Sequence, residues 1–449
     1  MKHTKEINAP RLLVLGYISI ISLGTLLLSL PWATTQRISF IDALYTASSS
    51  LCVTGLIVKN TALDFTLFGK CVILTLIQIG GLGYMTLSTV FFFFLGKKIS
   101  FRDRLLFKES INVLTLGNLR RFAWRVIRIT LVLEGIGTIL FYFSFRRAFD
   151  PMTALGHAVF HSISSFCNAG FSSFSENLSL FADFAWVPLT AAVLFIIGGL
   201  GFVVISDIYK TAITREKKKF ALHTTMVLRM TALLIVVGTL SIFLLEWDRA
   251  LAGQTTGQKL LLAFFQSVTP RTAGFNTMTV SLFSPLTLVM LMVFMFIGAS
   301  PGGTGGGVKT TTFSLLIHWI KELLLGRYGN DINTARKRIP LEQAYRAFLI
   351  VALGIGVLFA AFILIMFVDN PKPLSALFEV VSALGTVGLS MGSTVQRYCS
   401  FSHDLSVFGK LVIITVMITG RVGTITIGSA LLKPHPLEYK YPEEPIAVG

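Results

Sequence analysis

The sequence predicts an all-α polytopic membrane protein, built from four copies of a unit in which a half-helix lies between two membrane spans. Hydrophobic residues make up 53% of the 449 residues and charged residues only 14%, whereas soluble domains average about 25% charged residues. The apolar residues form blocks long enough to cross a bilayer core of about 30 Å. A glycine after a short apolar helix occurs four times, at Gly55, Gly170, Gly274 and Gly388, with separations of 115, 104 and 114 residues. A period of this length indicates a repeated unit of several elements.

Each unit places a half-helix before its glycine and a glycine-bearing span after it. The half-helices are about a dozen residues long, too short to cross a bilayer, and are expected at residues 41–51, 153–166, 259–269 and 374–385. The following spans carry glycine clusters at residues 80–83, 198–201, 298–307 and 420–423. The pattern predicts eight transmembrane helices and four re-entrant half-helices around one pore. The repeats are expected at residues 1–95, 96–206, 207–325 and 326–432, followed by a cytoplasmic tail at 433–449.

The first repeat is expected to begin with a span over residues 11–30, because Pro31 restricts the residue before it to non-helical dihedral angles. Its half-helix is expected to open near Asp42, whose carboxylate suits the positive end of a helix. The second span starts after the tripeptide Phe-Gly-Lys at residues 68–70. The same tripeptide opens the last span at residues 408–410 and supports the repeat independently of the four glycines.

The second repeat carries three residues that invite a chemical interpretation. Glu134 is a lone acid within the third span, at 126–145, and such acids are functional or paired; we expect a structural pair or a hydrogen bond to a neighbouring helix ahead of ion binding. His157 and His161 lie four residues apart on one face of the half-helix. A zinc-protease signature would need a glutamate where Ala158 stands, so we expect the histidines to pack or to lie at an interface.

The remaining spans follow the same order along the chain. The fourth span is expected to end near Asp207, and the others lie at residues 226–245, 285–320, 344–368 and 405–432. The sixth span differs from the rest, because a glycine-rich stretch from Gly298 to Lys309 interrupts its apolar pattern.

The net charge of +17 is concentrated in three of the loops between spans. Their basic residues include Lys97, Lys98, Arg102, Arg104, Lys108, Arg120, Arg121, Arg125, Lys210, Arg215, Lys217, Lys218, Lys219, Lys321, Arg327, Arg336, Lys337 and Arg338. The alternate loops are poor in positive charge, and the positive-inside rule therefore places both termini in the cytoplasm. Binding to nucleic acid is not expected, because no soluble domain is left to carry a basic surface.

Four half-helices that each stop at a glycine can surround one axis within the membrane. Non-helical backbone at membrane depth must be buried or line a wet cavity. The carbonyl groups of such turns can replace the hydration shell of a cation, while the half-helices direct their negative ends inward. Glycine suits these turns because a β-carbon would obstruct both the dihedral angles and the close approach of the backbones. The pattern therefore predicts a cation pore.

At these residues the chain resembles the Trk/Ktr/HKT superfamily of potassium transporters, and within it the membrane subunits of bacterial Ktr systems. The resemblance covers nearly the whole chain and rests on the four glycine segments, the stretch from Thr269 to Asn276, the break in the sixth span and Gly420-Arg421. The length also fits the Ktr subunits. The related TrkH proteins typically carry an additional pair of spans, for which this chain is expected to have no room.

The resemblance implies potassium uptake across the bacterial plasma membrane through a selectivity filter, with K⁺ bound at the filter glycines. The filter would comprise Val53, Thr54, Gly55, Asn168, Ala169, Gly170, Thr272, Ala273, Gly274, Thr386, Val387 and Gly388. Plant members with serine at the first filter position are expected to select sodium, so Gly55 favours potassium.

The resemblance also implies an intramembrane gate beneath the filter, with a pore-facing arginine as a positive barrier or latch. The gate would comprise Gly298, Ala299, Ser300, Gly302, Gly303, Thr304, Gly305, Gly306, Gly307, Lys309 and Arg421. Glycines and a threonine cannot hold a rigid helix, and segments of this kind supply movable elements.

The same resemblance implies a homodimer in the lipid bilayer, with one pore in each subunit, seated on a cytosolic KtrA-like regulatory ring. The regulatory nucleotide would bind that ring, since this chain carries no nucleotide motif, and we expect no cofactor bound to the chain itself. Transport in the family is often sodium-stimulated, but these residues locate no sodium site.

Three alternatives use the same residues. A phosphate-binding loop at Lys309-Thr310 is disfavoured, because Val308 stands where that motif needs glycine. A sodium-coupled secondary transporter is the second alternative, but such proteins usually have two halves with broken helices, against four equivalent units here. An intramembrane enzyme would have only Glu134 and the two histidines to work with, without a nucleophile–base constellation. We therefore expect no enzyme activity and no catalytic residue.

Overall fold

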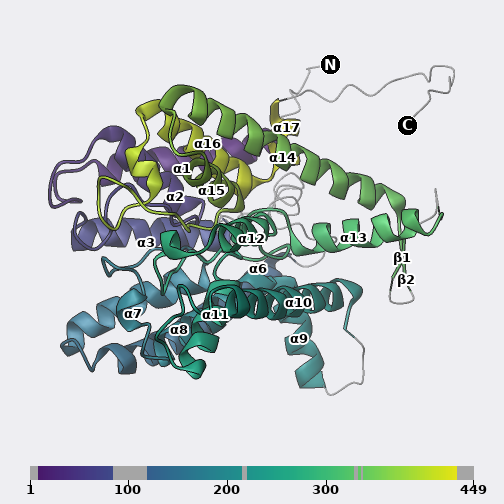
Figure 1. Ribbon diagram of the computed structural model, residues 1–449, viewed down its shortest axis with the longest axis horizontal. Helices are drawn as coiled ribbons and strands as arrows, with labels where there is room; N and C mark the ends of the chain where they lie inside the picture. Colours follow the sequence, from purple (N-terminus) through teal and green to yellow (C-terminus); the bar gives the residue numbers. More distant parts are fainter. Residues whose placement is uncertain (1–8, 84–118, 215–219, 328–331, 335–336, 432–449) are drawn as a thin grey trace.

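Helices form almost all of the regular structure (Figure 1). The structure, a computed structural model, describes residues 9–83, 119–214, 220–327, 332–334 and 337–431. Within this part of the chain, the strands form one short antiparallel hairpin, β1 (Ile332–Thr334) with β2 (Lys337–Ile339). The first basic loop lies largely outside the described residues, as do Lys217 and the tail from residue 433.

Four long apolar helices lie where the odd-numbered spans were predicted. They are α1 (Ala9–Leu28), α6 (Leu119–Phe145), α10 (Leu222–Leu245) and α14 (Leu341–Asp369). Each is long and apolar enough to cross a membrane.

Short helices lie at all four positions where the half-helices were predicted. They are α2 (Phe40–Leu51), α7 (Pro151–Phe166), α11 (Thr256–Val268) and α15 (Pro373–Gly385). The first three begin at the side-chain caps Ser39, Asp150 and Thr255, whose oxygens accept backbone N–H groups of the first turn. The fourth begins with Pro373, which suits the first helical position because it has no N–H to leave unpaired.

The helices that follow the half-helices are short, at 12–16 residues. They are α3 (Leu67–Leu82), α8 (Trp186–Leu200), α12 (Pro285–Phe296) and α16 (Val407–Val422). After α8 the chain turns by 96° into α9 (Phe202–Thr214), and after α16 it turns by 105° into α17 (Thr424–Leu431). The fourth span, expected to end near Asp207, and the eighth, expected over 405–432, are therefore each bent at a glycine. Gly201 and Gly423 make the turns with φ of 94° and 99°, dihedral angles that glycine adopts readily.

The break predicted in the sixth span is present. Residues 297–309, named here the α12–α13 loop, join α12 to α13 (Thr310–Leu324). By length and composition, the described residues contain four helices that can cross a membrane, or up to six if each bent pair is one span. The count of eight spans remains a prediction.

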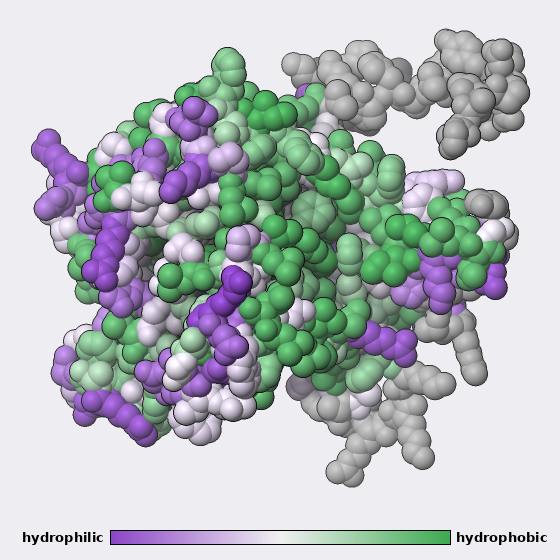
Figure 2. All heavy atoms as spheres, viewed as in Figure 1, coloured by the Kyte–Doolittle hydropathy of each residue, from purple (hydrophilic) through white to green (hydrophobic). Residues whose placement is uncertain are grey.

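Large apolar side chains cover the outside of the helices. Phe367 is 87% exposed and Leu244 is 73% exposed. Figure 2 shows hydrophobic residues over the middle of one face, with hydrophilic residues towards two opposite edges. A surface of this kind is stable against lipid hydrocarbon, and with the long apolar helices it makes the chain a multi-pass membrane protein.

In three of the four clusters, the first glycine lets a helix pack closely against the preceding half-helix. A Cβ added to Gly80, Gly198 or Gly420 would lie 2.0, 2.1 or 2.0 Å from a carbonyl oxygen in the last turn of that half-helix. These distances are far shorter than any van der Waals contact, so only glycine fits at the three positions. The close packing fixes the ends of these half-helices, and thereby the segments that follow them.

Candidate functional site

The four repeated glycines lie side by side in a closed ring, named here the four-glycine ring. A Cβ added to Gly55, Gly170, Gly274 or Gly388 would lie 2.5, 3.0, 2.2 or 2.2 Å from the carbonyl oxygen just before the next glycine. The fourth glycine meets the segment of the first in this way, so the order around the ring follows the chain. Four segments more than 100 residues apart in sequence thus surround one axis.

The four segments share one backbone conformation. The glycines have φ of 92°, 70°, 72° and 94° in chain order. The residues two positions earlier, Val53, Asn168, Thr272 and Thr386, have φ of 56°, 59°, 71° and 50°. Positive φ is rare outside glycine and strained for β-branched residues such as valine and threonine. Its recurrence at one position in all four repeats indicates a conformation imposed by a common role.

Hydrogen bonds behind the ring turn the backbone N–H groups away from the axis. The residue before the glycine donates its N–H to a serine carbonyl of the half-helix at 2.8 Å in three repeats, the serines being Ser49, Ser164 and Ser382. The hydroxyls of Ser49 and Ser382 also accept the N–H of Gly55 and Gly388, both at 3.1 Å. These serines were not singled out from the sequence, although a serine six residues before the glycine recurs in three repeats.

Seven carbonyl oxygens at or just before the ring glycines are left unpaired in the described part of the chain. Among the described residues, no hydrogen bond ends on the carbonyl oxygens of Thr54, Gly55, Ala169, Ala273, Gly274, Val387 or Gly388. Unpaired carbonyls within a membrane must face water or a cation. Rings of such oxygens are able to replace the hydration shell of an ion.

One side of the ring opens into a polar cavity of about 390 Å³ lined by all four glycines. The side-chain amide of Asn177 donates to the carbonyl oxygen of Gly170 at 3.4 Å. The hydroxyl of Tyr398 donates to Glu176 at 2.5 Å, joining the second and fourth repeats across the cavity wall. An ion leaving or reaching the ring on this side would therefore pass polar groups.

The α12–α13 loop lies directly against the other side of the ring. Thr304 donates its hydroxyl to Asn168 Oδ1 at 2.9 Å, and the N–H of Gly306 donates to Thr386 Oγ1 at 2.9 Å. A Cβ added to Gly305, which lies between these two residues, would be 1.8 Å from Thr272 Oγ1. These three partners each lie two residues before a ring glycine, so the loop touches three of the four repeats beneath the ring.

The glycine clusters hold the loop in this place. The N–H of Ser300 donates to the carbonyl oxygen of Gly199 at 3.0 Å, and that of Gly307 to Gly420 at 3.3 Å. Carbonyls at the ends of α8 and α16 accept these bonds because the helices stop at the clusters. The broken helices and the loop therefore depend on each other.

Two basic side chains also donate hydrogen bonds to the loop. The guanidinium of Arg421 donates to the carbonyl oxygens of Thr304 and Gly80. The amino group of Lys309 donates to Gly305 at 2.8 Å and to Gly306 at 3.3 Å. Neither cation forms an ion pair within the described part of the chain. Two uncompensated positive charges thus lie beneath the ring.

The remaining candidates from the sequence support the backbone near the ring. Glu134 accepts a hydrogen bond from Gln78 of α3 at 3.3 Å, which is the helix-to-helix contact that was expected. His157 and His161 hydrogen-bond the hydroxyls of Ser173 and Ser172 at 2.6 and 2.9 Å. These serines follow Gly170, so the two histidines hold the chain where it leaves the ring.

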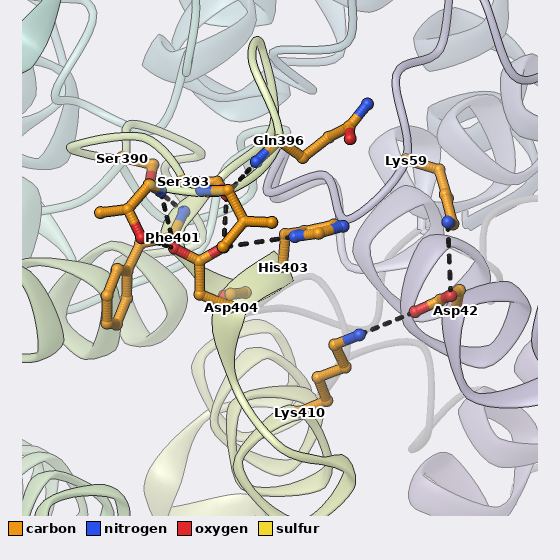
Figure 3. A network of polar contacts seen from close by, with 12 residues as sticks. Asp42, Lys59, Ser390, Ser393, Gln396, Phe401, His403, Asp404 and Lys410 are labelled. Carbon is orange, nitrogen blue, oxygen red and sulfur yellow. Dashed lines mark hydrogen bonds and ion pairs between the residues drawn. The ribbon is translucent and has the colours of Figure 1, made fainter. Parts of the chain in front are cut away.

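A polar network joins the last repeat to the first (Figure 3). Lys410 of α16 and Lys59 both pair with Asp42 of α2, at 2.9 and 3.9 Å. The N–H of Ile57 donates to Ser400 Oγ at 2.9 Å, and the N–H of Ser400 donates to the carbonyl of Ile57 at 2.8 Å. These contacts, two residues beyond Gly55, join the fourth repeat directly to the first and so close the four-repeat arrangement.

Asp404 holds the segment between α15 and α16 beside the Lys410–Asp42 pair (Figure 3). Burial acts to raise the pKa of this carboxyl group, but hydrogen bonds from Ser393 and Thr394 outweigh it, and the pKa lies below its ordinary value. The carboxylate also accepts the N–H of Thr394 at 2.7 Å. The ionised carboxylate of Asp404 thus helps to hold the segment between α15 and α16 in its folded conformation.

Replacing Asp42 with asparagine is expected to destabilise the fold by about 3 kcal/mol, because Lys410 would stay buried without a counter-charge. The side chains of Asp42 and Lys410 are only 11% and 12% exposed. The measurement is the free energy of unfolding of the purified protein in detergent.

The matched control for Asp42→Asn is Glu342→Gln, which breaks an ion pair whose partners are 71% and 72% exposed. Its effect is expected to stay within about 0.5 kcal/mol. Equal effects of the two substitutions would contradict a structural role for the Asp42 pair.

Comparison with known proteins gives consistent matches over nearly the whole chain. The family described as TrkH, cation transport protein, matches residues 12–438. The chain is 36% identical over 445 residues to the Ktr system potassium uptake protein B of Vibrio alginolyticus, covering 98% of this chain and 95% of that protein. It is 35% identical to the protein of the same name from Bacillus subtilis, with coverage of 98% and 96%. It is also 35% identical to the potassium/sodium uptake protein NtpJ of Enterococcus hirae, with coverage of 99% and 98%.

A solved structure shares the fold. The crystal structure of the potassium transporter TrkH from Vibrio parahaemolyticus matches with a TM-score of 0.76 at 21% identity, covering 96% of this chain and 87% of that one. At this identity the likeness concerns the fold alone.

Proposed function

Because the chain belongs to the TrkH family of cation transport proteins, we propose that it takes up potassium across a bacterial plasma membrane. The relatives from Vibrio alginolyticus and Bacillus subtilis are named potassium uptake proteins. The pore would be built from four repeats, at 1–95, 96–206, 207–325 and 326–432, with eight spans and four half-helices.

The observation that carries the proposal is the closed ring of four glycine segments with unpaired carbonyl oxygens. K⁺ would be coordinated at this ring, with the twelve residues from Val53 to Gly55, Asn168 to Gly170, Thr272 to Gly274 and Thr386 to Gly388 as the selectivity filter. The N–H groups are tied back to the half-helices, so the carbonyls keep their positions without a bound ion. Such preorganisation favours an ion whose size matches the ring.

The α12–α13 loop would act as the gate, because it fills the path directly beneath the ring. Arg421 and Lys309 would hold it closed through their bonds to loop carbonyls, and their charge would repel cations. Opening requires that the loop leave Asn168 and Thr386, which exchanges a few hydrogen bonds worth about 1 kcal/mol each. An equilibrium of this size is within reach of a regulatory partner.

The proposed assembly is a homodimer with one pore in each subunit, bound to a cytosolic KtrA-like ring that carries the regulatory nucleotide. The support is that the relatives are named as components of a Ktr system. A sodium-coupled secondary transporter is not favoured, since the ring has four equivalent segments.

The proposal predicts K⁺ flux through the purified protein reconstituted in liposomes, without any added chemical substrate. Flux should be measured with and without sodium and with and without the cytosolic partner. A folded protein that carries no K⁺ flux under all four conditions would overturn the proposal.

The proposed topology places the termini and the basic loops in the cytoplasm. Lys337→Cys in β2 should therefore resist an impermeant thiol reagent in intact cells and react after permeabilisation. Val395→Cys, at a position that is 77% exposed in the loop of the Asp404 network, should react in intact cells. Labelling of Lys337→Cys from outside would reverse the orientation.

A further inference from the structure

A second cavity lies on the far side of the α12–α13 loop from the four-glycine ring. Its volume is about 540 Å³, and its wall combines the loop with residues of α1, α13, α14, α16 and α17. Three basic side chains line it, from Lys309, Arg346 and Arg421. Among the described lining residues there is no aspartate or glutamate.

Within the described part of the chain, the positive charge of this cavity is not balanced by neighbouring acids. Lys309 and Arg421 contact backbone carbonyls of the loop and of α3. Arg346 pairs with Glu342 at 2.7 Å, but both side chains are largely exposed, and exposed pairs of this kind are weak. The cavity therefore carries a net positive charge even when Glu342 is counted.

Helix starts add hydrogen-bond donors to the same wall. Helix α13 begins at Thr310, whose N–H donates to the carbonyl oxygen of Ala299 at 3.3 Å. Its N-cap residue Lys309 makes no side-chain cap, so the N–H groups of Thr311 and Thr312 have no partner among the described residues. Thr312 in that turn lines the cavity, as do Thr424 and Thr426 at the start of α17. Helix N-termini favour anions, and phosphate groups in particular.

We propose that this cavity binds a phosphate group, supplied either by a free phosphate-bearing anion or by the headgroup of an anionic lipid. Lys309, Arg346 and Arg421 supply the charge, the first turn of α13 supplies N–H groups, and Thr312 and Thr426 supply hydroxyls. Together these donors match an oxyanion with several acceptor oxygens.

The consequence for transport rests on the proposed function of the pore. A cation that has passed the loop enters a cavity that repels it. A bound phosphate offsets Lys309 and Arg421, so K⁺ flux rises when the site is filled. The site is thus an anion-dependent regulator built into a cation pathway.

Binding is tested on the purified full-length chain in nanodiscs of phosphatidylcholine, titrated with the Tris salt of pyrophosphate. Saturable binding is expected for the wild type. At least tenfold weaker binding is expected for Lys309→Gln and Arg346→Gln, with recovery in Lys309→Arg. Lys321→Gln removes an equal charge from the exposed end of α13, away from the cavity, and should bind like the wild type.

The source of the phosphate is decided by repeating the titration in discs that contain phosphatidylglycerol. A fall of at least tenfold in pyrophosphate affinity assigns the site to the lipid headgroup, and an unchanged affinity assigns it to the free anion. Absence of saturable binding in phosphatidylcholine, or equal binding by Lys309→Gln, Arg346→Gln and the wild type, would overturn the proposal.

The flux assay separates this inference from the function on which it rests. Pyrophosphate on the side of the basic loops should raise wild-type K⁺ flux several-fold in phosphatidylcholine liposomes and leave Lys309→Gln unchanged. Normal flux without any response to pyrophosphate would refute the regulatory consequence alone. Absence of K⁺ flux would refute the pore, while the binding titration would still decide the site.

Discussion

Replacing Gly55 with serine is expected to reduce the preference for K⁺ over Na⁺ by about tenfold. The added Cβ would lie 2.5 Å from the carbonyl oxygen of Ala169, so this oxygen has to move away from the ring. The backbone at φ of 92° would also be strained, and strain of this kind amounts to about 1–3 kcal/mol. A loss of about 1.4 kcal/mol in the relative binding of the two ions corresponds to a factor of ten.

Gly388→Ser is the paired test, because its Cβ would meet the carbonyl oxygen of Thr54 at 2.2 Å. Gly253→Ser is the matched control, since Gly253 has φ of 79° but no atom within 4 Å of an added Cβ. The measurement is the ratio of K⁺ to Na⁺ flux in liposomes. An unchanged ratio in both Gly55→Ser and Gly388→Ser would count against the ring as the filter.

Removing Arg421 as the latch of the loop is expected to raise flux about tenfold or more. The guanidinium donates to Thr304 of the loop and to Gly80 of α3, and hydrogen bonds from charged groups contribute about 1.5–3 kcal/mol each. Arg421→Ala loses these bonds together with the positive barrier, so the open loop becomes more populated. Flux should be measured with and without the cytosolic partner, since dependence on the partner should weaken as well.

Deleting several residues between Pro301 and Gly306 tests the same gate without touching the arginine. If the loop obstructs the path, the deletion raises flux and loosens dependence on the partner. If the loop is scaffold, expression and flux fall together, because the glycine clusters lose their partners. Lys321→Ala is the matched control for charge, and a folded protein that gains no flux from Arg421→Ala or from the deletion would end the gating proposal.

The interdependence of loop and broken helices explains why the glycine clusters recur. The first glycine of a cluster lets the helix approach a half-helix, and the last allows the turn, as at Gly198 and Gly201. The carbonyls freed at the break then accept the loop. A substitution at Gly198 would therefore disturb packing and loop together.

The half-helices and the long spans could be predicted from the sequence because their signals are local. Length and apolarity identify α1 and α14, and the acid Asp42 marks where the first half-helix begins. The four-fold recurrence of a glycine also predicted one axis, and the ring has that arrangement. The hydrogen bond of Glu134 to a neighbouring helix followed from the cost of a lone acid in a membrane.

Tertiary structure alone decided the bends of the fourth and eighth spans and how the ring is held. A glycine inside an apolar run is compatible with a straight span, so the turns of 96° and 105° could not be read from the sequence. They form because carbonyls of the clusters bind the α12–α13 loop, which is distant along the chain. The closure of the last repeat on the first likewise depends on Lys410 reaching Asp42, 368 residues apart. Local patterns therefore determined which segments are helices and which glycines matter, whereas contacts between distant segments determined the bends, the backing serines and the cationic cavity beneath the loop.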